Sequence, residues 1–108
     1  MAKYLMAIDA GTGSVRAVLF DLAGNQLSCS QHEWEHSEDP RYPGSMDFDW
    51  IHNWDLAKGC IREVISSAHI DPREIAACST TCMREGIILY DAQGRGDLGL
   101  RKCGCQSK

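Results

Sequence analysis

Two glycines separated by a single residue follow a short apolar segment near the start of the chain. The residues that follow the segment are Asp9, Ala10, Gly11, Thr12, Gly13, Ser14, Val15 and Arg16. Glycine can adopt positive φ and has no side chain, so successive backbone amides can approach an anion closely. The Thr12 and Ser14 hydroxyls add donors, and the Asp9 carboxylate suits a magnesium ion that keeps its water ligands. The pattern predicts a phosphate-binding turn; the alternative is a tight β-hairpin whose glycines serve only the turn geometry.

A second polar group lies between two apolar segments in the C-terminal half. It spans residues 80–86 and includes Met83 and the adjacent pair Arg84 and Glu85. A guanidinium offers five hydrogen-bond donors and a carboxylate accepts hydrogen bonds. Such a pair suits a ligand rich in hydroxyl groups, which both donate and accept. The alternative is a solvated loop with ordinary surface charges.

A third segment, residues 43–49, combines a proline and a glycine with an acidic residue before an apolar periodic stretch. The Asp49 carboxylate can accept the unpaired amides at a helix N-terminus. Trp54 follows within the expected helix, and we expect it to be buried. By itself this segment indicates a loop and a helix cap rather than a binding site.

Strands are needed to position the first two groups. Apolar and alternating segments predict strands over residues 4–8, 15–20 and 26–36, which form a three-stranded meander. The glycine-containing segment and residues 21–25 carry the turn signals between them. Prolines and a glycine predict a loop over residues 37–45.

A helix is predicted over residues 50–68, followed by further strands. Its apolar stripe at helical spacing comprises Trp54, Ala57, Ile61, Val64, Ile65 and Ala68. Asp71 before Pro72 indicates a cap and one short helical turn. Strands over residues 75–80 and 87–90 and a turn at residues 91–94 complete the pattern. The sequence therefore predicts an α/β fold with a mixed sheet and a crossover helix.

Composition limits the class of protein. The chain has 108 residues, 44% hydrophobic and 24% charged, with a net charge of −4. This balance is typical of a globular domain and excludes a disordered tail, a collagen-like repeat and a coiled coil. An acidic chain has no field to attract nucleic acid, and no apolar run is long enough for a membrane helix. Without a signal-peptide pattern at its start, we expect a cytoplasmic protein.

The six cysteines favour free thiols over a metal site or disulfides. They are Cys29, Cys60, Cys78, Cys82, Cys103 and Cys105. Zinc sites usually use paired C-x-x-C spacings, which are absent from the sequence. A disulfide scaffold would fit a secreted protein, which the chain start does not indicate.

Taken together and in this order, residues 8–21, 43–54 and 83–94 resemble three motifs of the FGGY carbohydrate kinases, members of the actin-like ATPase superfamily. The resemblance covers residues 4–94, and the shared order makes it more specific than any one motif. It implies a truncated N-terminal subdomain of the actin-like, ribonuclease H-like ATPase fold.

The resemblance also implies an activity: transfer of the ATP γ-phosphate to a hydroxyl group of a small sugar-like substrate, with Mg²⁺. Phosphoryl transfer depends mainly on positioning and charge neutralisation. The family pattern implies an indirect metal contact from Asp9, phosphate contacts from Gly11, Thr12, Gly13 and Ser14 with Arg16 beside them, and substrate contacts from Met83, Arg84 and Glu85. The family's catalytic aspartate and adenosine pocket lie further downstream, so we expect this chain alone to be inactive.

The acceptor is less narrowly indicated. Residues 83–90 are most similar to the subgroup that phosphorylates the open-chain form of a quorum-sensing furanone precursor, although Cys82 stands where that subgroup has serine. Kinases for xylulose, fuculose or glycerol are alternatives. A non-catalytic module that binds a nucleotide or sugar, and a remnant that misfolds and aggregates, also remain open, as does the oligomeric state.

Residues 95–108 do not resemble the family and have no apolar period. Back-translation from Asp97 with permitted codons, read in another frame, gives a segment similar to the family's next strand and loop. We therefore expect a frameshift near Arg95, which the underlying DNA sequence would test.

Overall fold

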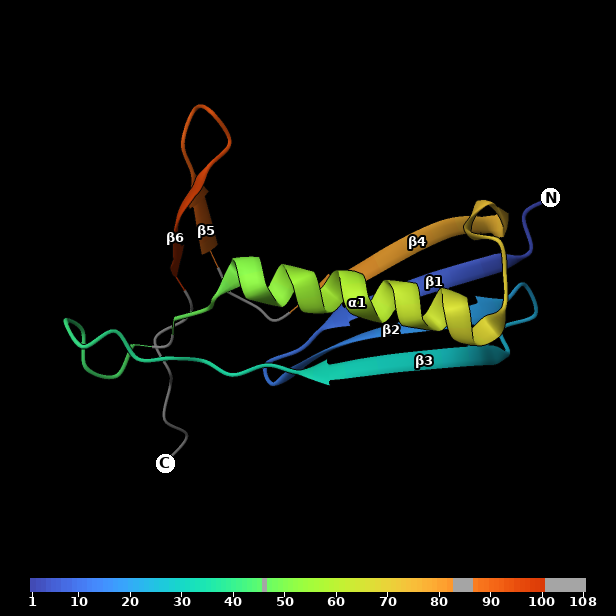
Figure 1. Ribbon diagram of the computed structural model, residues 1–108, viewed down its shortest axis with the longest axis horizontal. Coiled ribbons are helices and arrows are strands. Elements are labelled where there is room, and N and C mark those ends of the chain that lie inside the picture. Colours follow the sequence, from blue (N-terminus) through green and yellow to red (C-terminus); the bar gives the residue numbers. More distant parts are fainter. Residues whose placement is uncertain (46, 83–86, 101–108) are drawn as a thin grey trace.

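The computed structural model describes residues 1–45, 47–82 and 87–100. A four-stranded sheet carries one long helix on one face, and a separate two-stranded hairpin lies beyond the N-terminal end of that helix (Figure 1). The elements are β1 (Tyr4–Ala10), β2 (Ser14–Asp21), β3 (Gln26–Glu33), α1 (Trp50–Ala68), the short 3-10 helix η1 (Pro72–Glu74), β4 (Ile75–Cys82), β5 (Ile87–Tyr90) and β6 (Gly96–Leu100).

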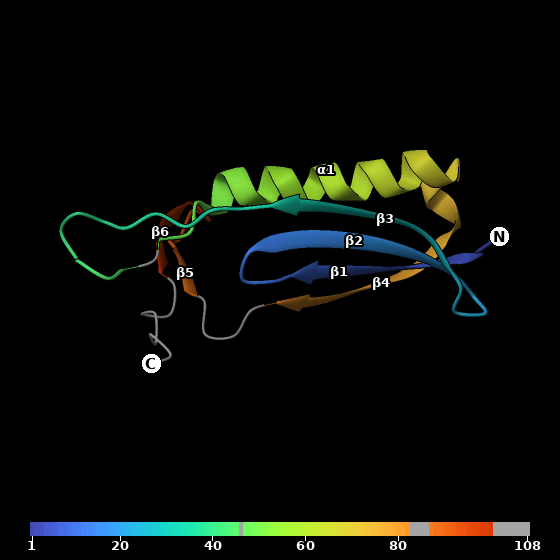
Figure 2. The ribbon, with the colours of Figure 1, turned by 90° about the horizontal axis from the view of Figure 1, so that it is seen from below.

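The larger sheet has the strand order β3-β2-β1-β4. β1 and β3 each pair antiparallel with β2, whereas β4 pairs parallel with β1. A parallel neighbour needs a crossover connection, and α1 supplies it by lying across one face of the sheet between β3 and β4 (Figure 2). The α/β fold with a mixed sheet and a crossover helix is thus confirmed.

The register of β1 and β4 places two sequence motifs at the same edge of the sheet. Ala10, the last residue of β1, is the register partner of Cys82, the last residue of β4. The carboxyl ends of parallel strands meet at one edge. The glycine-containing turn therefore starts beside the point where the chain enters residues 83–86.

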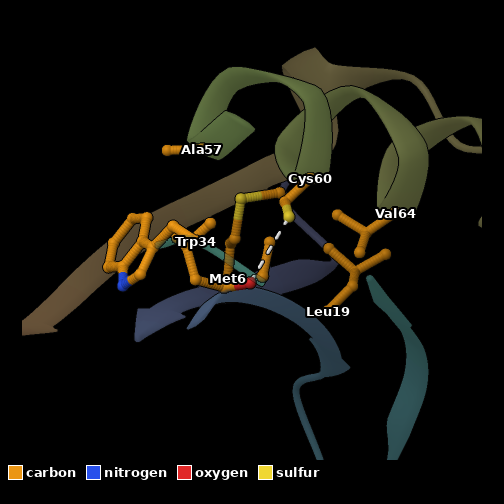
Figure 3. Packing of buried hydrophobic residues seen from close by; sticks show 8 residues of the cluster. Met6, Leu19, Trp34, Ala57, Cys60 and Val64 are labelled. Atoms are coloured by element: carbon orange, nitrogen blue, oxygen red, sulfur yellow. Dashed lines mark hydrogen bonds between the residues drawn. The ribbon is translucent and has the colours of Figure 1, made fainter. Parts of the chain in front are cut away.

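The core lies between α1 and the covered face of the sheet (Figure 3). Leu19 of β2 and Val64 of α1 are fully buried, and Cys60 is 1% exposed. The Cys60 thiol lies 3.6 Å from the Val15 carbonyl oxygen. Burial raises the pKa of this thiol, so it stays protonated and acts as a small apolar side chain. The four cysteines within the described residues are free thiols.

The helix packs most of its predicted stripe against the sheet: Ala57 and Val64 are buried, and Ile61, Ile65 and Ala68 lie against the core. Its bounds and the Asp49 cap are confirmed, with Asp49 Oδ1 accepting from the His52 amide at 3.0 Å. Trp54 is 57% exposed, however, and Asn53 is 2% exposed, so the expectation of a buried Trp54 is wrong. The buried positions of α1 are Asn53, Ala57, Cys60 and Val64. These are small or medium side chains, which allow a close approach of helix and sheet that an indole would prevent.

The hairpin of β5 and β6 repeats the turn that joins β2 to β3. In both turns an aspartate side chain accepts from two amides further along the turn, and a glycine adopts positive φ: Asp21 with Gly24 (φ 89°), and Asp91 with Gly94 (φ 78°). β6 lies in the segment for which the sequence predicted no element. Its backbone pairing with β5 forms it although its sequence is rich in glycine.

A carboxylate on α1 links the helix to β3 and gives the fold a pH dependence. Glu63 accepts a hydrogen bond from the Ser30 hydroxyl and lies 3.0 Å from His32 Nε2. These hydrogen bonds, first that of Ser30 and then that of His32, hold the pKa of Glu63 below its usual value of 4.5. A lowered folded-state pKa contributes stability above the unfolded pKa, and this stability is lost as the pH falls through the folded pKa.

We therefore expect the wild-type chain to lose more stability than Glu63→Gln between about pH 6 and pH 3. Urea denaturation of both proteins at several pH values measures the difference. If the two stability curves run parallel across this range, Glu63 does not contribute in this way.

Candidate functional site

The turn between β1 and β2 presents backbone donors to solvent. It is closed by a hydrogen bond from the Gly11 amide to the Ser14 carbonyl oxygen at 2.8 Å. Thr12 and Gly13 are exposed, and their amides have no acceptor among the residues that the structure describes. Two successive free amides on an exposed turn are the donor arrangement that backbone anion sites use.

The glycines of this turn have a different role from the one predicted. Within the described residues, the glycines with positive φ are Gly24, Gly44 and Gly94, so the expectation of positive φ at Gly11 and Gly13 is wrong. A Cβ added at Gly13 would meet nothing within 4 Å, and one at Gly11 would lie 3.4 Å from the Ser14 carbonyl oxygen. Backbone geometry thus permits other residues at Gly13. Glycine there leaves the amides open to a ligand.

Asp9 and Arg16 form an ion pair at the base of the turn. They are register partners on β1 and β2, and Arg16 Nη2 donates to Asp9 Oδ2 at 3.1 Å. Side chains alternate between the faces of a strand, so this pair lies opposite the α1 face that carries Ile8 and Val15. Both side chains are nearly half exposed, at 43% and 47%. A carboxylate and a guanidinium are thus available beside the free amides.

Two residues that the sequence did not single out hold the other side of the turn. Trp34 Nε1 donates to the Thr12 carbonyl oxygen at 3.1 Å, and His36 Nε2 donates to the same oxygen. The Trp34 amide donates to the Gly13 carbonyl oxygen at 3.0 Å. The alternation of residues 26–36 indicated only a strand end here, and no sequence signal pointed to contacts with the turn.

The predicted substrate residues Met83, Arg84 and Glu85 lie outside the described residues. The strand that precedes them ends beside the turn, through the pairing of Ala10 with Cys82. Next to this edge, on the α1 face, is a pocket of about 470 Å³. It is lined by Ile8, Ala10, Val15, Trp34, Phe48, Trp50, Asn53, Trp54, Ala57, Thr80, Thr81, Cys82, Ile88 and Tyr90.

Most of the pocket wall is apolar, and Asn53, Thr80 and Thr81 are its polar residues apart from the aromatic ones. Asn53 is buried, and its Nδ2 has no hydrogen-bond partner within the part of the chain that the structure describes. Asp9 and Arg16 lie on the other face of the sheet, so the pocket and the ion pair are distinct features of one sheet edge.

The sequence matches the model of one protein family over most of its length. Residues 4–101 match the model described as "FGGY family of carbohydrate kinases, N-terminal domain". The chain belongs to the FGGY family. The matched region includes the turn, the loop before α1 and the segment that holds Arg84 and Glu85. The position of the family boundary after residue 94 stays a prediction.

Curated relatives in this family include autoinducer-2 kinases. Those of Escherichia coli strain K12 and Salmonella typhimurium strain LT2 are each 56% identical over 91 residues, which is 84% of this chain and 17% of theirs. The chain therefore spans about one sixth of the length of these FGGY kinases.

Solved sugar kinases share the fold. A xylulose kinase from Rhodospirillum rubrum matches with a TM-score of 0.81 and 21% identity, covering 97% of this chain and 22% of that one. A gluconate kinase from Lactobacillus acidophilus matches with a TM-score of 0.79 and 20% identity, covering 93% and 20%. The observed sheet and crossover helix thus form the start of the sugar kinase fold, which is of the actin-like ATPase type.

Proposed function

We propose that this chain is the N-terminal segment of an ATP-dependent carbohydrate kinase and that the β1–β2 turn binds the phosphates of the nucleotide. The free amides of Thr12 and Gly13 carry the proposal, because both residues are exposed and their amides have no acceptor among the described residues. Arg16 adds positive charge at the base of the turn. Phosphoryl transfer needs mainly such positioned donors.

Magnesium is the expected companion of ATP, and Asp9 fits it as an indirect ligand. One oxygen of its carboxylate accepts from Arg16, and the other has no partner within the described part of the chain. Magnesium usually keeps several waters and uses one or two carboxylates. Asp9 would hold the ion through its waters, and the bound ion would neutralise charge on the phosphate oxygens.

The acceptor is proposed to be a small sugar-like alcohol, most like autoinducer-2, held by Met83, Arg84 and Glu85. The 56% identity to the autoinducer-2 kinases supports this choice over xylulose or gluconate, whose kinases share only the fold.

No helix in the described part of the chain is both long and apolar enough to span a membrane. We propose the cytoplasm as the location.

A chimera tests the function. Residues 1–94 of this chain are joined to the part of the E. coli autoinducer-2 kinase that follows the matched segment. We expect this chimera to phosphorylate autoinducer-2 with ATP, and the 108-residue chain alone to show no turnover. An inactive but folded chimera, or turnover by the isolated chain, would contradict the proposal.

Gly13→Ala in the chimera tests the phosphate turn itself. The added Cβ meets no protein atom within 4 Å, so the fold should be unchanged, while the methyl group obstructs the approach of phosphate. We expect the KM for ATP to rise about tenfold, the equivalent of about 1.4 kcal/mol. Gly59→Ala in α1, where a Cβ also meets nothing within 4 Å, is the matched control. If the two variants have equal KM values for ATP, Gly13 is not part of the phosphate-binding site.

A further inference from the structure

We infer that Trp34 and His36 are positioning residues that aim the Gly13 amide of the β1–β2 turn at the nucleotide phosphates. The inference rests on the proposed function and extends it to two side chains outside the motif. Neither side chain contacts the ligand in this proposal. Both act through the Thr12 carbonyl group.

In this turn, side chains from outside bond to a backbone carbonyl oxygen, whereas two backbone amides stay open. The Thr12 carbonyl oxygen accepts from two side chains, Trp34 Nε1 at 3.1 Å and His36 Nε2. A carbonyl oxygen has two lone pairs, so its capacity is filled. The amides of Thr12 and Gly13 have no acceptor among the described residues. Water could solvate a carbonyl at an exposed turn, yet the chain supplies two donors from outside the turn.

Peptide geometry converts this bonding into a direction for the amide. The described chain has no cis peptide bonds, and in a trans peptide the C=O and N–H groups point in opposite directions. The Thr12 carbonyl and the Gly13 amide belong to the same peptide. Holding the carbonyl toward Trp34 and His36 therefore turns the Gly13 N–H away from them, toward solvent.

The two donors are themselves held by packing. Trp34 is 7% exposed and meets the Phe48 ring edge to face, with 5.0 Å between ring centroids. The His36 ring lies 5.9 Å from the same Phe48 ring. Because a carbonyl oxygen only accepts, His36 must carry a proton on Nε2. Its buried Nδ1 has no partner among the described residues, so Nε2 makes the only hydrogen bond of this ring within them. A rigid aromatic group thus fixes both donor atoms.

Substitutions in the active chimera test the inference. Trp34→Phe keeps an aromatic ring but lacks the N–H donor, and His36→Leu removes the second donor. We expect the double variant to raise the KM for ATP about tenfold and to leave the KM for the acceptor within about twofold. His36→Gln should restore most of the affinity of the single His36→Leu variant, because its amide can donate from about the position of Nε2.

Controls separate this role from general stability. His52→Asn changes an exposed residue of α1 that does not line the pocket and should leave both KM values unchanged. In the 108-residue chain, the Gly13 amide resonance should shift in Trp34→Phe/His36→Leu and stay in place in His52→Asn. This NMR measurement uses the 108-residue chain and therefore does not require an active chimera.

The outcomes distinguish the two proposals. An inactive unsubstituted chimera contradicts the proposed function. An active chimera in which the double variant leaves the KM for ATP unchanged overturns only the inference, as does a failure of His36→Gln to improve on His36→Leu. An unshifted Gly13 resonance in the double variant also overturns it.

Discussion

Asp9→Asn in the chimera is expected to lower kcat by roughly a hundredfold, the scale on which single electrostatic contacts act in active sites. The substitution removes one negative charge and keeps the size of the side chain. An amide is a poor partner for the water shell of magnesium, so the ion is held less well at the phosphates. The amide oxygen can still accept from Arg16, which in the parent chain donates to the Asp9 carboxylate at 3.1 Å.

Steady-state kinetics with varied magnesium measures this effect. Stability should change little, because the Asp9–Arg16 pair is nearly half exposed and exposed ion pairs contribute little. Asp55→Asn is the matched control, since Asp55 is an exposed carboxylate paired with Lys58 at 2.8 Å on α1. If Asp9→Asn and Asp55→Asn have the same kcat as the parent chimera, Asp9 has no part in the reaction.

Leu19→Ala should cause the largest loss of stability. Leu19 is fully buried in β2, between the sheet and α1. Removing a buried leucine side chain costs the lost transfer free energy and the cavity left behind, about 3 kcal/mol in typical cores. A domain of this size is stable by only about 5–15 kcal/mol, so the variant should unfold at much lower urea concentration.

Equilibrium urea denaturation followed by circular dichroism measures the change in the 108-residue chain. Leu22→Ala is the matched control, because Leu22 is 61% exposed in the turn after β2. We expect it to change the free energy of unfolding by less than about 0.5 kcal/mol. Similar losses in the two variants would mean that α1 does not pack on this face of the sheet.

Local sequence signals predicted the elements well. The helix over residues 50–68 and its Asp49 cap are observed with the same bounds, since the apolar period and the cap are local properties. The first three strands are found where the sequence placed them; β1 and β2 extend a little further than predicted, whereas β3 ends at Glu33 and not at residue 36. Pairing with neighbouring strands adds residues that have no strong signal of their own.

The burial of Asn53 in place of Trp54 was not predictable from the stripe. Trp54 is far more hydrophobic than Asn53, so the apolar period placed Trp54 against the sheet. The structure buries Asn53 and Cys60 because the distance between α1 and the sheet depends on side-chain size at the contact. β6 was missed for a related reason, as only its pairing with β5 makes a strand of residues 96–100.

The sequence identified residues of the candidate site but did not predict the geometry of the turn. Spacing identified the turn from Asp9 to Arg16, and the structure gives the reason for its glycines as access rather than positive φ. The contacts of Trp34 and His36 join residues more than twenty positions apart. Such contacts depend on strand register, which a single sequence does not specify.

The central claim is that the β1–β2 turn and the segment with Arg84 and Glu85 face one cleft that holds nucleotide and acceptor together. A crystal structure of the chimera with a non-hydrolysable ATP analogue and the acceptor measures this directly. We expect a phosphate oxygen within about 3 Å of the Gly13 amide nitrogen, and the acceptor hydroxyls on Arg84 and Glu85 across the same cleft. A nucleotide bound away from the turn, or Arg84 and Glu85 on the far side of the molecule, would contradict the claim.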